Sequence, residues 1–117
     1  MDKEYAVVFC VVNTGFSGAV MDAARKAGAS GGTILKGRGT ASRDAEKVFN
    51  ITIQPEKEIV MILVSAGIKD GVLRAIYDAA GLDAPGQGIA FSLPVERALG
   101  IGQALKETPP APDAAIE

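Results

Sequence analysis

The strongest strand signal lies near the N-terminus, in the segment Tyr5-Ala-Val-Val-Phe-Cys-Val-Val12. It is rich in β-branched and aromatic residues and is followed at once by the turn residues Asn13-Thr14-Gly15. A second segment, Ile59-Val-Met-Ile-Leu-Val64, has the same character. Both are too short for a lone core helix and are apolar at successive positions, which predicts strands buried on both faces or nearly so. A sheet built from them cannot leave either face in water.

The other elements follow from periodicity and breaker residues. Ser17 offers an N-cap hydroxyl to the first helix, and Pro94 marks an edge or a bend in the last strand. The predicted elements are helices over Ser17–Gly28 and Ile68–Gly81, short strands over Thr33–Lys36 and Ile89–Leu93, and one long excursion from Gly37 to about Glu58.

This order predicts an α+β, ferredoxin-like βαββαβ fold, in which two helices cover one face of a four-stranded antiparallel sheet. The other face has no cover of its own, so association with further copies is expected. The folded domain is predicted to span residues 1–107. Residues 108–117 carry three prolines and no periodicity, which predicts a disordered tail.

Composition excludes several kinds of function. The 117 residues include no histidine, no tryptophan and a single cysteine, Cys10, which is expected to be a buried, inert thiol. A Ser-His-Asp or Cys-His catalytic site cannot be built from this chain alone, and neither can a cysteine/histidine zinc site. Asp44 with Glu46, and Glu56 with Glu58, lie in polar runs typical of a solvated surface. We therefore expect no enzyme and no metal site.

The charge balance and the lengths of the apolar runs bear on partners and location. The formal net charge is −2, which argues against nucleic acid as the main partner. The longest apolar runs fall far short of the roughly 20 residues that span a membrane. Asp2, Lys3 and Glu4 precede the first apolar run, so the basic opening of a secretory signal is missing. A cytoplasmic location is expected.

Three glycine-bearing segments could hold a ligand, because glycine lets backbone amides approach closely and adopt positive φ. They are Gly31-Gly32, Lys36-Gly37-Arg38-Gly39-Thr40 and Gly86-Gln87-Gly88. In the second, Lys36 and Arg38 suit phosphate or another small anion. Plain turns at strand ends would explain the same glycines, and the spacing is not that of a Walker motif.

These segments together resemble the PII signal-transduction superfamily, in its PII-like branch. The resemblance runs from about Lys3 to Gly102. It rests on the segment Gly31-Gly-Thr-Ile-Leu-Lys-Gly-Arg-Gly-Thr40, the long loop that follows it, the strand before Val64 and the segment Gly86-Gln-Gly-Ile-Ala-Phe-Ser-Leu-Pro-Val95. It implies a homotrimer with clefts between subunits that bind adenine nucleotides, and a long T-loop that reports the ligand to a target protein. Family members include regulators of nitrogen metabolism.

The resemblance also implies which residues act. Lys36, Gly37, Arg38, Gly39 and Thr40 would bind ligand at the base of the T-loop, and Gly86, Gln87, Gly88 and Ile89 would form the phosphate-binding B-loop. The T-loop itself would span about 41–56, with Ser42, Arg43 and Lys47 facing the target. Its polar part, Ala41 to about Val48, is predicted to be mobile without ligand.

The position of Ile89 holds a lysine in classical nitrogen-regulatory PII proteins. With fewer cations in the cleft, AMP or ADP is expected to bind at least as tightly as ATP. No obligatory cofactor is implied. The target could be a membrane transporter or an enzyme. Two other functions fit the same fold: a structural or metal-handling trimer similar to the cation-tolerance proteins, and a small phosphohydrolase, although Asn13-Thr14-Gly15 lacks the arginine that such an enzyme needs.

Overall fold

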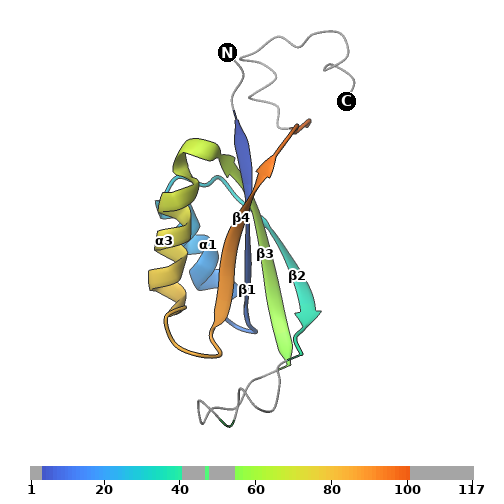
Figure 1. Ribbon diagram of the computed structural model, residues 1–117, viewed down its shortest axis with the longest axis vertical. Helices are drawn as coiled ribbons and strands as arrows, with labels where there is room; N and C mark the ends of the chain where they lie inside the picture. The colour runs from blue at the N-terminus through green and yellow to red at the C-terminus, as the bar shows by residue number, and fades with distance from the viewer. Residues whose placement is uncertain (1–3, 41–46, 48–54, 101–117) are drawn as a thin grey trace.

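The computed structural model describes residues 4–40, 47 and 55–100. Its elements follow the predicted order (Figure 1). They are β1 (Tyr5–Asn13), α1 (Ser17–Lys26), β2 (Thr33–Arg38), β3 (Glu56–Ser65), the 3₁₀ turn η1 (Ala66–Ile68), α3 (Lys69–Ala80) and β4 (Gly88–Val95).

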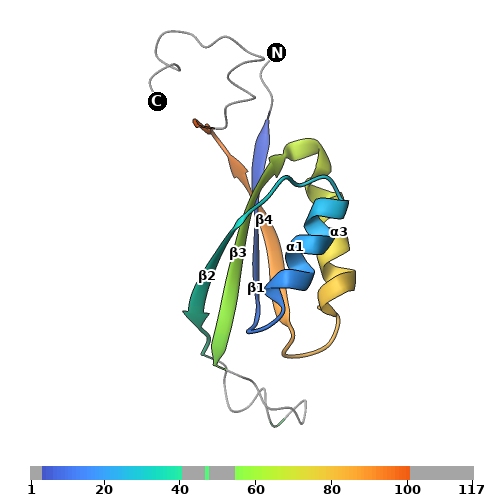
Figure 2. The same cartoon turned by 180° about the vertical axis from the view of Figure 1, so that it is seen from behind.

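The four strands form one antiparallel sheet in the order β2-β3-β1-β4. β1 and β3 are the central strands, so the two most apolar segments of the sequence lie in the middle of the sheet. α1 and α3 lie side by side on one face, and Figure 2 shows the same arrangement from behind. The predicted ferredoxin-like fold is confirmed.

Strict alternation along β1 and β3 builds the core. In β1, Ala6, Val8, Cys10 and Val12 point toward the helices and are buried, while the residues between them are half-buried. Val60, Ile62 and Val64 of β3 continue the same layer, and the helices close it with residues such as Val20, Val72 and Ile76. The predicted burial of Cys10 is confirmed, and this burial raises the pKa of its thiol to about 11.

The opposite face of the sheet, here called the open face, carries apolar side chains that no element among the described residues covers. Phe9 of β1 stacks on Phe91 of β4 with ring centroids 5.5 Å apart. Leu35, Ile89 and Leu93 are exposed on the same face. A contiguous apolar patch of this kind marks an interaction surface.

The excursion between β2 and β3 is shorter than predicted. The expected excursion ran from Gly37 to about Glu58, but Gly37 pairs with Lys57 and Arg38 pairs with Glu56 in the sheet. Glu56 therefore belongs to β3 and not to the predicted loop of 41–56. Glycine fits at this strand position because a Cβ on residue 37 would lie 3.1 Å from the Cδ1 atom of Ile59.

The ends of the helices correct one prediction and confirm another. Ser17 was expected to cap α1, but it is the first helical residue; the N-cap position is Phe16, which offers no side-chain hydrogen bond. α3 ends at Gly81, as predicted, and this glycine adopts the left-handed conformation at φ 65°. The predicted tail, 108–117, the domain boundary at 107 and the predicted mobile segment 41–48, apart from Lys47, lie outside the described residues.

Gly88 offers a test of the packing at the start of β4. Its φ is +140°, and a Cβ there would overlap the carbonyl oxygen of Val11 in the neighbouring strand. Gly88→Ala should therefore lower the free energy of unfolding by at least ~2 kcal/mol, from backbone strain and overpacking. Gly71→Ala, in α3 with no atom within 4 Å, is the matched control and should stabilise the fold by about 0.5–1 kcal/mol. Urea unfolding measures both; equal effects would contradict this packing.

Candidate functional site at one end of the sheet

Both groups of predicted ligand residues lie at the same end of the sheet. β1 and β2 end there, β3 and β4 begin there, and the connection from α3 to β4 passes across it, at the bottom of Figure 1. We call this the loop end. The first group, from Lys36 to Thr40, consists of the end of β2 and the two residues after it. The second group, from Gly86 to Ile89, consists of the two residues before β4 and the first two residues of that strand.

The sheet order separates the two groups within one chain. β2 and β4 are the two edge strands, with β3 and β1 between them. Three interstrand spacings amount to about 14 Å, so the side chains of the two groups do not meet directly in one copy. The structure places the predicted residues at one end of the molecule but on opposite edges.

Two polar residues between the edges form a connection that the sequence prediction missed. The Lys57 Nζ atom donates a hydrogen bond to Asn13 Oδ1 at 2.6 Å, and Asn13 Nδ2 donates to the carbonyl oxygen of Gly86 at 3.2 Å. Because Lys57 also pairs with Gly37 in the sheet, this chain of contacts runs from the first group to the second. From the sequence alone, Asn13 is predicted only as a turn residue.

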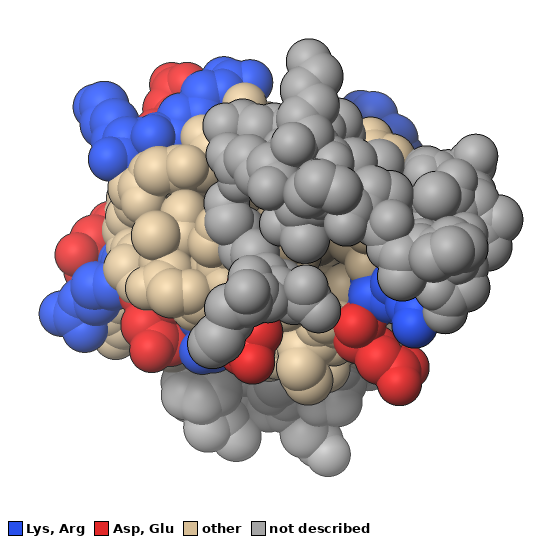
Figure 3. All heavy atoms as spheres, turned by 90° about the horizontal axis from the view of Figure 1, so that it is seen from above, with Lys and Arg blue, Asp and Glu red and all other residues tan. Residues whose placement is uncertain are grey.

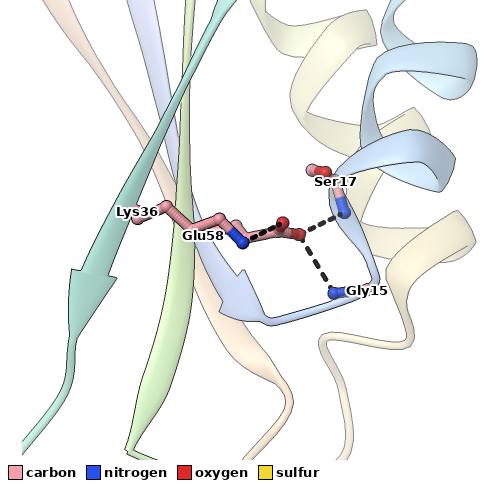
Figure 4. A network of polar contacts seen from close by, with 4 residues as sticks. All are labelled: Gly15, Ser17, Lys36 and Glu58. Atoms are coloured by element: carbon pink, nitrogen blue, oxygen red, sulfur yellow. Dashed lines mark hydrogen bonds and ion pairs between the residues drawn. The ribbon is translucent and has the colours of Figure 1, made fainter.

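Glu58 is the other residue that the prediction misjudged. It was expected on a solvated surface, but it is only 8% exposed and points toward the start of α1 (Figure 4). Its Oε1 atom accepts hydrogen bonds from the backbone N–H groups of Gly15 at 3.0 Å and Ser17 at 3.2 Å. Glu58 thus supplies, from a distant strand, the cap that Ser17 was predicted to give. Together with the nearby Lys36 ammonium, these hydrogen bonds lower the pKa of the Glu58 carboxyl.

The cations of the first group differ in their surroundings. The Lys36 Nζ atom lies 3.8 Å from Glu58 Oε2, and its side chain is 79% exposed. Part of its charge is therefore already balanced. Arg38 is exposed at the end of β2, one step beyond Gly37. Gly39 donates its backbone N–H to the carbonyl oxygen of Pro55 at 2.6 Å, which joins the two chain ends that leave the sheet.

The second group is shaped by its glycines. Gly86 and Gly88 adopt φ values of 81° and 140°, conformations that side chains rarely allow. Gln87 donates its N–H to the carbonyl oxygen of Ala84 at 3.3 Å, forming a turn. Ile89 follows on the open face and is 57% exposed, so an apolar side chain stands at the rim of this group.

The predicted target-binding residues lie largely beyond what the structure describes. Ser42 and Arg43 are outside the described residues, and Lys47 is exposed. Within residues 4–40, 47 and 55–100, no cluster of three cysteine, aspartate or glutamate side chains could hold a metal ion. No helix of that part of the chain is long and apolar enough to cross a membrane. Seen from above, basic and acidic side chains alternate around the rim (Figure 3).

Comparison with solved structures places this architecture among known folds. No protein-family model matches the sequence, and no curated protein matches it. The structure is similar to that of Arabidopsis thaliana PII bound to citrate, with a TM-score of 0.66 and 22% identity, covering 88% of this chain and 85% of that one. The chain therefore has the PII-like, ferredoxin-like fold.

Two further structures share the fold. A Thermus thermophilus protein described as a putative PII-like signaling protein has a TM-score of 0.60 and 19% identity over 81% of this chain and 90% of that one. A Bacillus cereus protein related to NIF3 has a TM-score of 0.62 and 18% identity over 83% of this chain but only 26% of its own. At these identities the likeness shows the fold.

The pKa of Glu58 predicts a dependence of stability on pH. Because that pKa is lower in the folded chain than in the unfolded one, the charged carboxylate stabilises the fold above its ordinary pKa, near 4.3. This contribution is lost as the pH falls through the folded value. Glu58→Gln, which removes the charge, should therefore be clearly less stable than the unaltered chain at pH 7, and the difference should shrink toward pH 3.

Urea unfolding across this pH range measures the difference in the free energy of unfolding. Glu56→Gln is the matched control, since Glu56 is exposed two residues earlier on the same strand. It should change stability less at pH 7. If Glu58→Gln and Glu56→Gln destabilise equally at every pH, the role assigned to the Glu58 carboxylate is wrong.

Proposed function

We propose that the chain is a PII-like signalling protein and not an enzyme. In this proposal it binds an adenine nucleotide or a related small anion at the loop end, in clefts between the copies of a homotrimer. It then acts on a target protein through the segment between Thr40 and Pro55. The observation that carries the proposal is the contact chain Lys57–Asn13–Gly86, which couples the two glycine-bearing groups at one end of a PII-like sheet.

The charges at the loop end favour a ligand with little phosphate charge. Lys36 is engaged with Glu58, and Ile89 occupies the position where the resemblance implies a lysine. Arg38 and Lys57 are two further cations there, and among the described residues Lys57 donates to Asn13, which is neutral and does not balance its charge. Two cations match a mono- or diphosphate, or a carboxylate, better than a triphosphate. The citrate bound by the Arabidopsis PII structure supports an anionic effector of this size.

Regulation requires that the ligand distinguish two states of the protein. The hydrogen bond between Gly39 and Pro55 joins the ends of the proposed T-loop directly beside Lys57, since a Cβ on Gly39 would lie 2.8 Å from the Lys57 Cε atom. An anion that draws Lys57 away from Asn13 would therefore disturb the packing beneath Gly39. This is a physical route from the ligand to the loop that would contact a target.

A substitution on the open face tests the proposed trimer. Phe91 of that face and Phe16 of the β1–α1 turn are equally exposed in one copy, at 40% and 39%. Phe91→Gln should weaken the assembly by at least about tenfold, because each copy loses an apolar side chain buried between subunits, while Phe16→Gln should leave it intact. Light scattering at falling concentration follows the mass, which should start near three chains. A stable monomer in the unaltered protein would contradict the trimer.

Ligand binding is tested by calorimetric titration of AMP, ADP, ATP, cyclic AMP, bicarbonate and citrate. AMP or ADP should bind at least as tightly as ATP. Arg38→Ala should weaken binding about ten- to a hundredfold, the contribution of one charge-assisted contact, without dissociating the trimer. Arg25→Ala, an exposed arginine in the last turn of α1, at the other end of the molecule, is the control and should bind as before.

Two results would count against the site. Tight, magnesium-dependent ATP binding that survives Arg38→Ala would show that the phosphates lie elsewhere. If none of the six compounds binds to a trimer that is otherwise intact, the sensor proposal fails and the structural trimer becomes the better explanation.

A further inference from the structure

A hollow of about 440 Å³ lies between α3 and the edge strand β4, which stand next to each other in Figure 1. Every residue that lines it belongs to one copy of the chain. Its volume is in the range of small-molecule sites, roughly 300–1,000 Å³. The hollow has an apolar wall, which includes Leu73, Tyr77, Leu82 and Ala90, and a charged rim, which consists of Asp70 and Arg74.

The wall is open because the strand residues that face the helices are small. Ala90 pairs with Cys10 and Gly88 pairs with Val12, and both partners point toward the helices. A methyl group and a hydrogen atom leave space beside α3 that a larger side chain would fill. Tyr77, on the helix side of that space, is 40% exposed. A ligand with a large apolar side chain would cover apolar surface that the chain itself leaves in contact with water.

The rim brings two opposite charges to the border of this wall. Asp70 and Arg74 stand one helical turn apart on α3, so their side chains project from the same side of the helix. The guanidinium carbon of Arg74 lies 5.3 Å from the centre of the Tyr77 ring, and this contact holds the cation beside the apolar wall. Arg74 Nε also lies 3.6 Å from Asp78 Oδ1, but the two side chains are 74% and 63% exposed. Such surface pairs are weak, and the guanidinium has further N–H donors for a ligand carboxylate.

The two charges of the rim select among ligands. A ligand with a single charge would be attracted by one of these side chains and repelled by the other. A zwitterion can place its anionic group at Arg74 and its cationic group at Asp70. The carboxylate and the ammonium group of an α-amino acid are attached to one carbon atom. This spacing suits two side chains one helical turn apart, whose Cβ atoms are separated by about 5–6 Å.

We propose that the hollow binds an α-amino acid with a large apolar side chain. The ligand carboxylate contacts Arg74 and the ligand ammonium group contacts Asp70. The apolar side chain of the ligand lies against Leu73 and Tyr77. This site goes beyond the proposed function, because it requires neither an anion at the loop end nor a second copy of the chain. Arg38 lies on the opposite edge strand, so a substitution can affect one site without the other.

Calorimetric titration of the unaltered protein with matched ligands tests the chemistry of the site. L-phenylalanine and L-leucine should bind at least about tenfold more tightly than L-alanine, because alanine lacks the large apolar side chain. L-phenylalanine should also bind at least about fivefold more tightly than hydrocinnamate, which lacks the ammonium group, and than phenethylamine, which lacks the carboxylate. These comparisons need no variant, so they do not depend on the stability of one.

Arg74→Gln tests where the ligand carboxylate lies. It should weaken the binding of phenylalanine at least about fivefold and leave the binding of phenethylamine no weaker than before, so that the preference between the two is lost. Damage to the fold would weaken both ligands alike. Arg25→Gln is the matched control, since Arg25 is an exposed arginine of α1 that does not line the hollow. This control and Arg38→Ala should both bind phenylalanine as the unaltered chain does.

Each result decides the proposal. A preference for phenylalanine over both singly charged analogues that Arg74→Gln removes supports the site. The proposal is wrong if neither phenylalanine nor leucine binds at concentrations up to about 10 mM. It is also wrong if hydrocinnamate binds as tightly as phenylalanine, or if Arg74→Gln changes nothing. If phenylalanine binds here but none of the six compounds titrated for the loop end does, the sensor function fails and this site stands; the reverse result leaves the sensor function standing without this site.

Discussion

Two helices can cover only one face of a four-stranded sheet, and in this chain both faces are apolar. Strict alternation in β1 sends Val8 and Cys10 to the helices and leaves Val7 and Phe9 on the open face. One copy on its own therefore buries the apolar side chains of only one face of its sheet and leaves those of the other face in contact with water. The open face follows from this constraint, and the order of strands places the two candidate ligand groups on opposite edges of the same sheet. An assembly of more than one copy could bury the open face, which a single copy leaves exposed.

Much of the architecture could be predicted because it depends on local periodicity. The apolar runs of β1 and β3 and the helical spacing of Val72 and Ile76 are visible in short windows. The missed features depend on contacts between distant segments. Gly37 and Arg38 look like loop residues until β3 pairs with them, and Glu58 looks solvated until the turn at Gly15, 43 residues away, donates to it. The same holds for Asn13 and Lys57, 44 residues apart, whose contact no sequence pattern contains.

The comparisons show how widely this fold is used. It makes up most of the Arabidopsis and Thermus proteins, but the match covers only 26% of the Bacillus cereus protein. A fold shared in this way does not define a function, which has to be argued from the groups placed on it. Here the groups on which the proposed function depends are Arg38, Lys57 and the two glycines of the second group.

The hydrogen bond between Gly39 and Pro55 has an evolutionary consequence. It fixes the ends of the intervening segment on the sheet by backbone atoms alone, whatever side chains the segment contains. Changing the length of a flexible connection costs little, about 0.6 kcal/mol for each doubling. Insertions, deletions and substitutions between these two residues would thus leave the domain almost equally stable. The sequence and length of the chain between these two residues could therefore change during evolution while β2 and β3 keep their pairing.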